Sequence, residues 1–196
     1  LERKTFMPMK QIQSMKFKFY AVKLCFFLLA IFLIQLFVSG FTDLFLLNSG
    51  SFSQPWRFVT AVFLHGGFMH LFYNIFALAL FGSILERFIG GKRFLIVFFV
   101  TGILANLVSV NFYDNSLGAS GAIFGIIGSL IIVRPLMVIW AFGLPMPIFI
   151  AGILWAAGDI IGIFVPSDVA NLAHLSGMFF GLIFGAIYRK RSKRLI

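Results

Sequence analysis

Long apolar runs dominate this sequence and decide what the chain can fold into. They lie at residues 20–38, 69–89, 94–110, 120–133, 147–165 and 170–188. A helix needs roughly 20 apolar residues to cross a bilayer. With 61% hydrophobic and 11% charged residues, the chain does not fit the water-soluble, disordered or disulfide-rich classes. We expect an all-α polytopic membrane protein with six transmembrane helices.

Basic residues flank the apolar runs and predict how the chain is oriented. The net charge is +10, and much of it lies in the tails 1–19 and 189–196. With six spans in residues 20–188, both tails share one side of the membrane, while the loops of the opposite side hold one basic residue, Arg57. The positive-inside rule then makes both tails cytoplasmic. The loops on the cytoplasmic side add Arg87, Lys92, Arg93 and Arg134.

The same charge distribution identifies the partners that the chain is expected to have. A strongly basic protein can bind nucleic acid, but charges that flank apolar spans instead contact anionic lipid headgroups. We therefore expect the lipid bilayer as a partner and no nucleic acid.

Polar side chains inside the apolar runs are candidates for function, because lipid makes them costly. His70 and Asn74 lie in the second run, Ser120 begins the fourth, and His174 lies in the sixth. These three runs cross from outside to inside, and all four residues lie in the first third of their run. They therefore share one depth near the outer face. Asp159 in the fifth run is expected to reach the outer interface as an isolated polar group.

The fourth run is too short to cross a bilayer alone. As a helix, residues 120–133 would be roughly 21 Å long, against a hydrocarbon core of about 30 Å. If Arg134 anchors the inner end, the outer end at Ser120 stops below the membrane surface. Irregular backbone at that depth is tolerated when it lines a cavity or is buried. We predict a submerged, water-holding pocket beneath residues 111–119.

Glycines follow one side of the fourth and sixth runs. Small residues at helical spacing let two helix backbones approach closely. This is common packing by itself, but if the two stripes face each other they bring Ser120 and His174 within side-chain reach. The stripes are Gly121, Gly125 and Gly128 in the fourth run, and Gly177, Gly181 and Gly185 in the sixth.

Ser120 and His174 provide the groups that acyl transfer needs. A helix start favours negative charge, as an oxyanion requires, and His174 can accept the Ser120 proton and return it to a leaving amine. His70 and Asn74 share a helix face and can add N–H donors. The sequence places no acidic residue to orient His174, which favours a dyad over a triad. A metal site lacks a third close ligand, so no metal or cofactor is expected, and His65 is expected to be solvated.

Several motifs occur together in a fixed order. Residues 70–74 read His-Leu-Phe-Tyr-Asn, residues 118–122 read Gly-Ala-Ser-Gly-Ala, and residues 173–177 read Ala-His-Leu-Ser-Gly. With these spacings, residues 56–188 resemble the rhomboid family of intramembrane serine proteases, in its compact six-helix prokaryotic form. Further marks of the resemblance are the pair Trp56-Arg57 and the spaced residues Gly82, Glu86 and Gly90.

The resemblance implies a rhomboid-like bundle and a role for each site residue. Ser120 would be the nucleophile and His174 the base. His70, Asn74 and the backbone of Ala119 and Ser120 would be oxyanion donors. Glycines and an aromatic ring would support the site, namely Gly118, Gly121, Gly177 and Phe124, the last by stacking on the base.

The function implied is that of an intramembrane serine endopeptidase. It would cleave peptide bonds in or near the transmembrane helices of substrate proteins, at a site that opens toward the outer face. The family admits substrate by moving its fifth helix and a cap loop, here residues 147–165 and 166–168. An inactive rhomboid-like protein that binds or escorts membrane proteins is the alternative. A small transporter fits less well, because it would carry broken helices and ion-binding charges at the membrane midplane.

Overall fold

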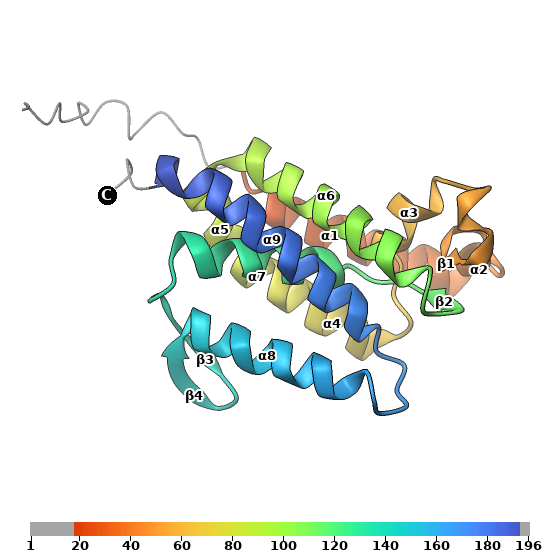
Figure 1. Ribbon diagram of the computed structural model, residues 1–196. Coiled ribbons are helices and arrows are strands. Elements are labelled where there is room, and N and C mark those ends of the chain that lie inside the picture. Colours follow the sequence, from red (N-terminus) through yellow and green to blue (C-terminus); the bar gives the residue numbers. More distant parts are fainter. Residues whose placement is uncertain (1–17, 193–196) are drawn as a thin grey trace, which may run out of the picture.

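The computed structural model describes residues 18–192, which form a mostly helical bundle (Figure 1). The helices are α1 (Tyr20–Phe37), α2 (Phe41–Phe45), α3 (Arg57–Thr60), α4 (Phe68–Ala77), α5 (Ser83–Ile89), α6 (Gly91–Ser109), α7 (Ser120–Val133), α8 (Ile148–Gly162) and α9 (Asn171–Ser192). Two short 3₁₀ helices are η2 (Ser49–Phe52) and η3 (Ala61–Phe63), and the π-helical segment η4 (Leu78–Gly82) joins α4 to α5. Two small antiparallel pairs join β1 (Leu47–Asn48) to β2 (Asn115–Ser116) and β3 (Val138–Ala141) to β4 (Leu144–Pro147).

The apolar helices lie where the sequence predicts spans. Four of those in the described chain are long and apolar enough to cross a membrane, which agrees with an integral multi-pass membrane protein. α7 and α8 are shorter. The predicted tails fall largely outside the described residues, at 1–17 and 193–196. The helix α9 continues to Ser192, into the predicted tail 189–196.

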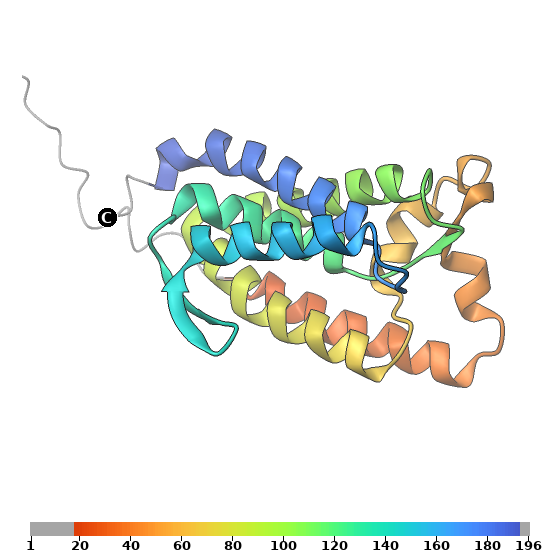
Figure 2. The ribbon, with the colours of Figure 1, turned by 60° about the horizontal axis from the view of Figure 1, so that its bottom comes forward.

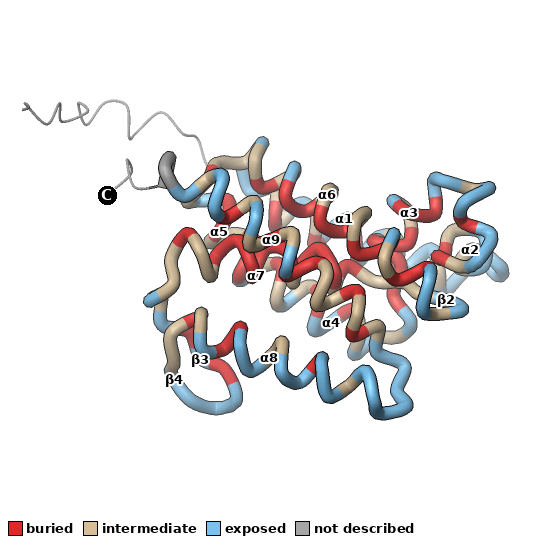
Figure 3. Tube along the Cα trace, viewed as in Figure 1, coloured by how far each residue is buried: buried red, intermediate tan, exposed pale blue. Residues whose placement is uncertain are grey.

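The short helix α7 is the centre of the bundle. Most of its 14 residues are buried, and it lies between α9 on one side and the continuous helix of α4, η4 and α5 on the other (Figure 2). Figure 3 shows the same contrast in burial, with α7 largely buried and the outlying α8 largely exposed. Because protein surrounds α7, its end can stop short of the membrane surface without exposing backbone to lipid.

Glycines on α9 let it lie directly on the backbone of α7. A Cβ added to Gly177 would overlap the carbonyl oxygen of Gly121, and one on Gly181 would overlap that of Gly125. At the same contact, the Ser129 hydroxyl donates a hydrogen bond of 2.9 Å to the carbonyl of Gly181. The prediction that the α9 stripe faces α7 is confirmed.

The glycines of α7 serve two neighbours rather than one. A Cβ added to Gly121 would lie 2.6 Å from the Cβ of Ala105, and one on Gly125 would overlap Thr101, so both face α6. Gly128 faces α9 instead. The α7 stripe therefore meets the α9 stripe along its backbone, and Gly121 and Gly125 also leave room for α6.

A buried carboxylate attaches α1 to α5. Glu86 is 1% exposed, and its two oxygens accept hydrogen bonds from the backbone N–H groups of Lys18 and Ala21, at 3.2 and 3.1 Å. The first N–H groups of a helix have no partner within it, and the positive end of the helix dipole favours an anion there. Glu86 therefore satisfies both needs at the start of α1.

The loop between α1 and α4 is folded against the bundle. Arg57 is buried, and its guanidinium donates to the carbonyls of Asp43 and Leu46, at 2.8 and 2.6 Å. The Asn106 amide of α6 donates to the carbonyl of Phe58 at 2.9 Å. These bonds join the loop to itself and to α6, so this segment is structured.

The hairpin β3–β4 between α7 and α8 is a feature that the sequence does not predict. Val138 pairs with Pro147, and Ala141 pairs with Leu144 across a two-residue turn. Both turn residues have positive φ, 53° at Phe142 and 77° at Gly143. Such two-residue turns match the twist of paired strands, so the chain reverses tightly here before α8 begins.

Candidate active site

Three helix ends meet at one end of the bundle. A Cβ added to Gly118 would lie 2.8 Å from Cε1 and Nε2 of His70, and 3.9 Å from the hydroxyl of Ser120. The imidazole at the start of α4 and the hydroxyl at the start of α7 therefore lie on one side of Gly118. Next to Ser120, a Cβ on Gly121 would lie 3.5 Å from the carbonyl oxygen of Ala173 in α9.

Ser120 occupies the first position of α7. Two residues before it, Gly118 has a backbone conformation that only glycine adopts easily. Gly118 has φ +125°, and its N–H donates to the carbonyl of Ala61 at 2.9 Å. Ala119 follows as the buried N-cap residue. The helix therefore starts inside the protein, where its free N–H groups and its positive dipole end favour a developing negative charge.

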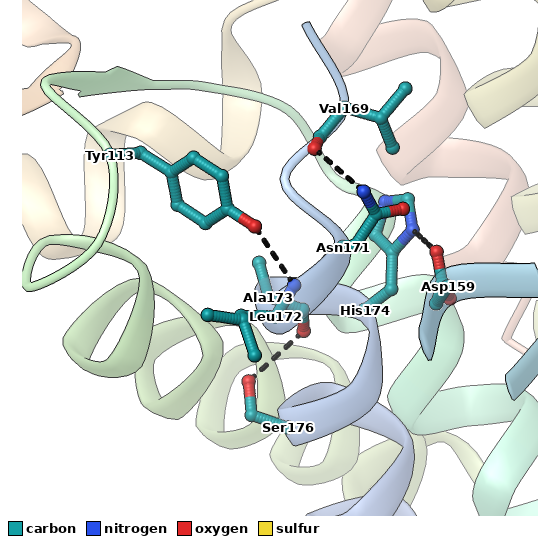
Figure 4. A network of polar contacts seen from close by, with 8 residues as sticks. All are labelled: Tyr113, Asp159, Val169, Asn171, Leu172, Ala173, His174 and Ser176. Carbon is teal, nitrogen blue, oxygen red and sulfur yellow. Dashed lines mark hydrogen bonds and ion pairs between the residues drawn. The ribbon is translucent and has the colours of Figure 1, made fainter. Parts of the chain in front are cut away.

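The ring of His174 is held by two contacts from two other helices. Phe124 of α7 stacks on it, with ring centroids 4.4 Å apart and planes 5° from parallel. Oδ1 of Asp159 in α8 lies 3.0 Å from its Nδ1 (Figure 4). The expectation that Asp159 reaches the outer interface is wrong, because its side chain is buried and faces His174. The sequence places Asp159 in a helix but does not reveal the direction in which that helix presents it.

Gly121 of α7 lies close to Ala173 of α9. Ser120 directly precedes Gly121, and His174 directly follows Ala173, so both residues lie beside this helix contact. In residues 18–192 no hydrogen bond joins the Ser120 hydroxyl to the imidazole. Catalytic hydrogen bonds are often long in proteins without substrate and shorten when substrate binds. The roles of the two residues as nucleophile and base therefore stay predictions.

His70 and Asn74 present polar groups from one face of α4. The N–H of Gly66 donates a weak bond of 3.5 Å to Nδ1 of His70, which assigns the ring proton to Nε2, the atom beside Gly118. The Asn74 amide donates to the carbonyl of His70 at 2.7 Å. That bond uses one of its two N–H groups, so one donor remains on each residue.

His65, expected to be solvated, is buried behind His70. The ring is 2% exposed, its centroid lies 5.1 Å from that of His70, and Gln35 binds its backbone N–H and carbonyl at 3.0 and 3.2 Å. Burial, with a smaller contribution from the charge of His70, lowers the pKa of His65 to about 3. His65 is therefore an uncharged side chain at neutral pH, packed against the ring of His70. Three or more His, Cys, Asp or Glu side chains in metal-binding proximity do not occur within the described ranges.

A cavity of about 270 Å³ lies beneath the loop between α8 and α9. Its lining includes Tyr113, Gly162, Pro166 and Asn171. The Tyr113 hydroxyl accepts a 3.1 Å hydrogen bond from the N–H of Leu172, which ties the segment before α7 to the start of α9 (Figure 4). Pro166 and Ser167 of the predicted cap loop therefore line a hollow next to the helix that carries His174.

Comparison with known proteins agrees with these features. The chain is 33% identical over 145 residues to the putative rhomboid protease YdcA of Bacillus subtilis (strain 168), a match covering 71% of this chain and 70% of that protein. It is 28% identical over 145 residues to the rhomboid protease GlpG of Haemophilus influenzae, covering 72% and 73%. It is 31% identical over 134 residues to RHOMBOID-like protein 7 of Arabidopsis thaliana, covering 67% of this chain but 42% of that longer protein.

A family model described as the Rhomboid domain matches residues 52–191. That range contains α3 to α8, α9 up to its last residue but one, and every residue of the candidate site. The chain therefore belongs to the rhomboid family, whose members are generally intramembrane serine proteases.

Proposed function

We propose that this chain is an intramembrane serine endopeptidase that cleaves peptide bonds in or beside the transmembrane helices of other proteins. The observation that carries the proposal is that the His70 imidazole and the Ser120 hydroxyl both lie near Gly118. The next residue after Ser120, Gly121, contacts α9 at Ala173, which directly precedes His174. The relatives named as rhomboid proteases support the same reaction class.

In the proposed reaction, the Ser120 oxygen attacks the carbonyl carbon of the scissile bond while its proton passes to Nε2 of His174. The negative oxygen that results lies at the start of α7. The backbone N–H groups of Ala119 and Ser120, with the side chains of His70 and Asn74, donate to it. Such donors act strongly in a site that excludes bulk water.

His174 then returns the proton to the leaving amine nitrogen, and the carbon–nitrogen bond breaks to leave an ester on Ser120. A water molecule attacks this ester, and His174 takes its proton and returns it to the Ser120 oxygen. The products are a free amine and a free carboxyl end, and both residues regain their starting state.

The substrate must unwind before this can happen, because a helix uses its own carbonyl groups in hydrogen bonds. We expect cleavage near small or helix-breaking residues, which lower the cost of unwinding. We further propose that α7 and α8 complete six membrane crossings, with both termini cytoplasmic and the site open to the outer face. Movement of α8 and the 166–168 cap would admit substrate.

Replacement of Ser120 by Ala tests the proposal. The protein is reconstituted in liposomes with a model transmembrane substrate, and the products are identified by mass spectrometry. We expect loss of cleavage and of fluorophosphonate labelling, with unchanged thermal unfolding. Ser116→Ala, a hydroxyl removal in β2, is the matched control and should retain both.

Cleavage by a clean Ser120→Ala preparation would remove Ser120 from its role. A folded wild-type protein that neither cleaves nor reacts with the probe would instead favour the alternative, a rhomboid-like protein that binds or escorts membrane proteins.

A further inference from the structure

Asp159 is a buried carboxylate on an otherwise apolar helix. Its neighbours Ile160 and Ile161 are 52% and 65% exposed, whereas Asp159 is 7% exposed. A carboxylate can reach water from the outward side of a helix end, but here it turns into the protein. Burial of a charge is costly unless a polar partner compensates, so the partner indicates why this carboxylate is present.

That partner is the imidazole of His174. Oδ1 of Asp159 lies 3.0 Å from Nδ1 of the ring, while the buried Oδ2 has no hydrogen-bond partner among the described residues. All polar contact that the carboxylate makes within residues 18–192 therefore goes to the side chain that the proposed reaction uses as its base.

The contact restricts which ring nitrogen carries the proton. An ionised carboxylate can only accept hydrogen bonds, so Nδ1 of His174 must be the donor. In the neutral ring, Nε2 then holds the lone pair and is free to take a proton. Phe124 stacks on the ring face, so the two neighbours together fix both the tautomer and the plane of the imidazole.

We propose that Asp159 is a positioning residue that holds His174 in the reactive tautomer, giving a serine–histidine–carboxylate relay drawn from α7, α9 and α8. The catalytic part of this inference rests on the proposed function. When His174 takes the Ser120 proton, the ring becomes a cation that faces the carboxylate, which stabilises that state without itself taking the proton.

The relay also makes the base depend on the position of α8. Ile148, Ala151 and Gly152, in the first half of α8, are buried, whereas in its second half Asp159 is buried among largely exposed neighbours. Movement of this half away from α9 would break the contact and release the ring of His174. The reactive tautomer would then be favoured only while α8 is seated.

Two measurements on Asp159→Asn and Asp159→Ala test the proposal. The first is steady-state cleavage in liposomes, where we expect kcat to fall about a hundred- to ten-thousand-fold with KM changed less than about threefold. Asp43→Asn, in α2, removes an exposed carboxylate away from α8 and the cap loop and should retain full kcat. Thermal unfolding confirms that each variant is folded.

The second measurement is ¹⁵N NMR of histidine-labelled protein, with the His174 signals assigned through His174→Gln. We expect a protonated Nδ1 and a bare Nε2 in the wild type, and a growing Nε2–H population in Asp159→Ala. A wild-type ring protonated mainly on Nε2, or an unchanged tautomer in Asp159→Ala, would overturn the proposal. Since NMR needs no turnover, it decides the role of Asp159 even if the wild type proves inactive, which would count against the proposed function alone.

Unchanged kcat in a folded Asp159→Asn protein would also overturn the proposal. If Asp159→Ala does not fold, the Asn variant carries both measurements, because it keeps the shape of the side chain while it removes the charge and replaces one acceptor oxygen with an amide donor.

Discussion

α9 and α8 both pack beside α7, but they are held in opposite ways. α9 lies backbone to backbone on α7, with its glycines facing carbonyl oxygens and with a buried hydroxyl bond at Ser129. The second half of α8 is largely exposed, and a Cβ added to Gly158 would meet nothing within 4 Å. The fold therefore combines a rigid pair that sets the position of Ser120 relative to His174 with a neighbour that touches the site through Asp159.

Glycine therefore has different structural roles in α9 and in the second half of α8. On α9 the absence of a side chain permits contact with another backbone, and packed interiors do not yield to extra atoms. On α8, Gly158 has open space around it, so an alanine at this position would not disturb any packing contact. Three glycine-to-alanine substitutions turn this difference into measurements.

The largest effect is expected for Gly181→Ala. The new Cβ would overlap the Gly125 carbonyl, and backbone cannot move aside as a side-chain tip can. We expect a loss of at least about 2 kcal/mol in the free energy of unfolding, with reduced cleavage because α9 moves relative to Ser120. Unfolding titrations in mixed detergent measure the first and liposome assays the second. Unchanged values for both would show that the two helices are not in backbone contact.

An intermediate effect is expected for Gly162→Ala at the end of α8. Its Cβ would lie 2.7 Å from the side-chain amide atoms of Asn171, which can rotate away at the cost of the bond from Asn171 to the carbonyl of Val169. We expect a loss of about 1 kcal/mol, measured by the same titration. A loss as large as that of Gly181→Ala would mean that the loop after α8 is as rigid as the α7–α9 contact.

The smallest effect is expected for Gly158→Ala, one residue before Asp159. With open space around the new methyl group and a better helix former in place, the expected change lies between zero and a gain of about 1 kcal/mol. Thermal unfolding in detergent would detect it. Destabilisation comparable to that of Gly181→Ala would contradict the view that this half of α8 is lightly packed.

The helices were predictable because hydropathy and length act locally. The run at 120–133 coincides with α7, and the expectation that His70 and Ser120 share one level followed from the common direction of their spans. Depth is a property of one span at a time. The direction in which a side chain faces depends on neighbouring helices, which is why the sequence alone predicts Asp159 at the interface and provides His174 with no carboxylate partner.

Two other features were missed for related reasons. The β3–β4 turn uses Phe142 at positive φ, although turn signals in sequence rely on Gly, Asn and Asp, and Pro145 within β4 argues against a strand. His65 lies in a loop, but Gln35 in α1 binds its backbone from 30 positions away. Contacts at that separation are not encoded in any local pattern.

The attachment of α1 has a consequence for how freely this protein can be redesigned. Glu86 accepts hydrogen bonds from main-chain N–H groups at the start of α1, so this attachment does not depend on which side chains α1 carries there. The rhomboid match begins at residue 52, after α1 has ended. The outward surface of α1, with Phe26, Leu29 and Leu36 exposed, is therefore open to wholesale replacement, whether to suit a different lipid or to carry a fused reporter, provided that the carboxylate of Glu86 is kept.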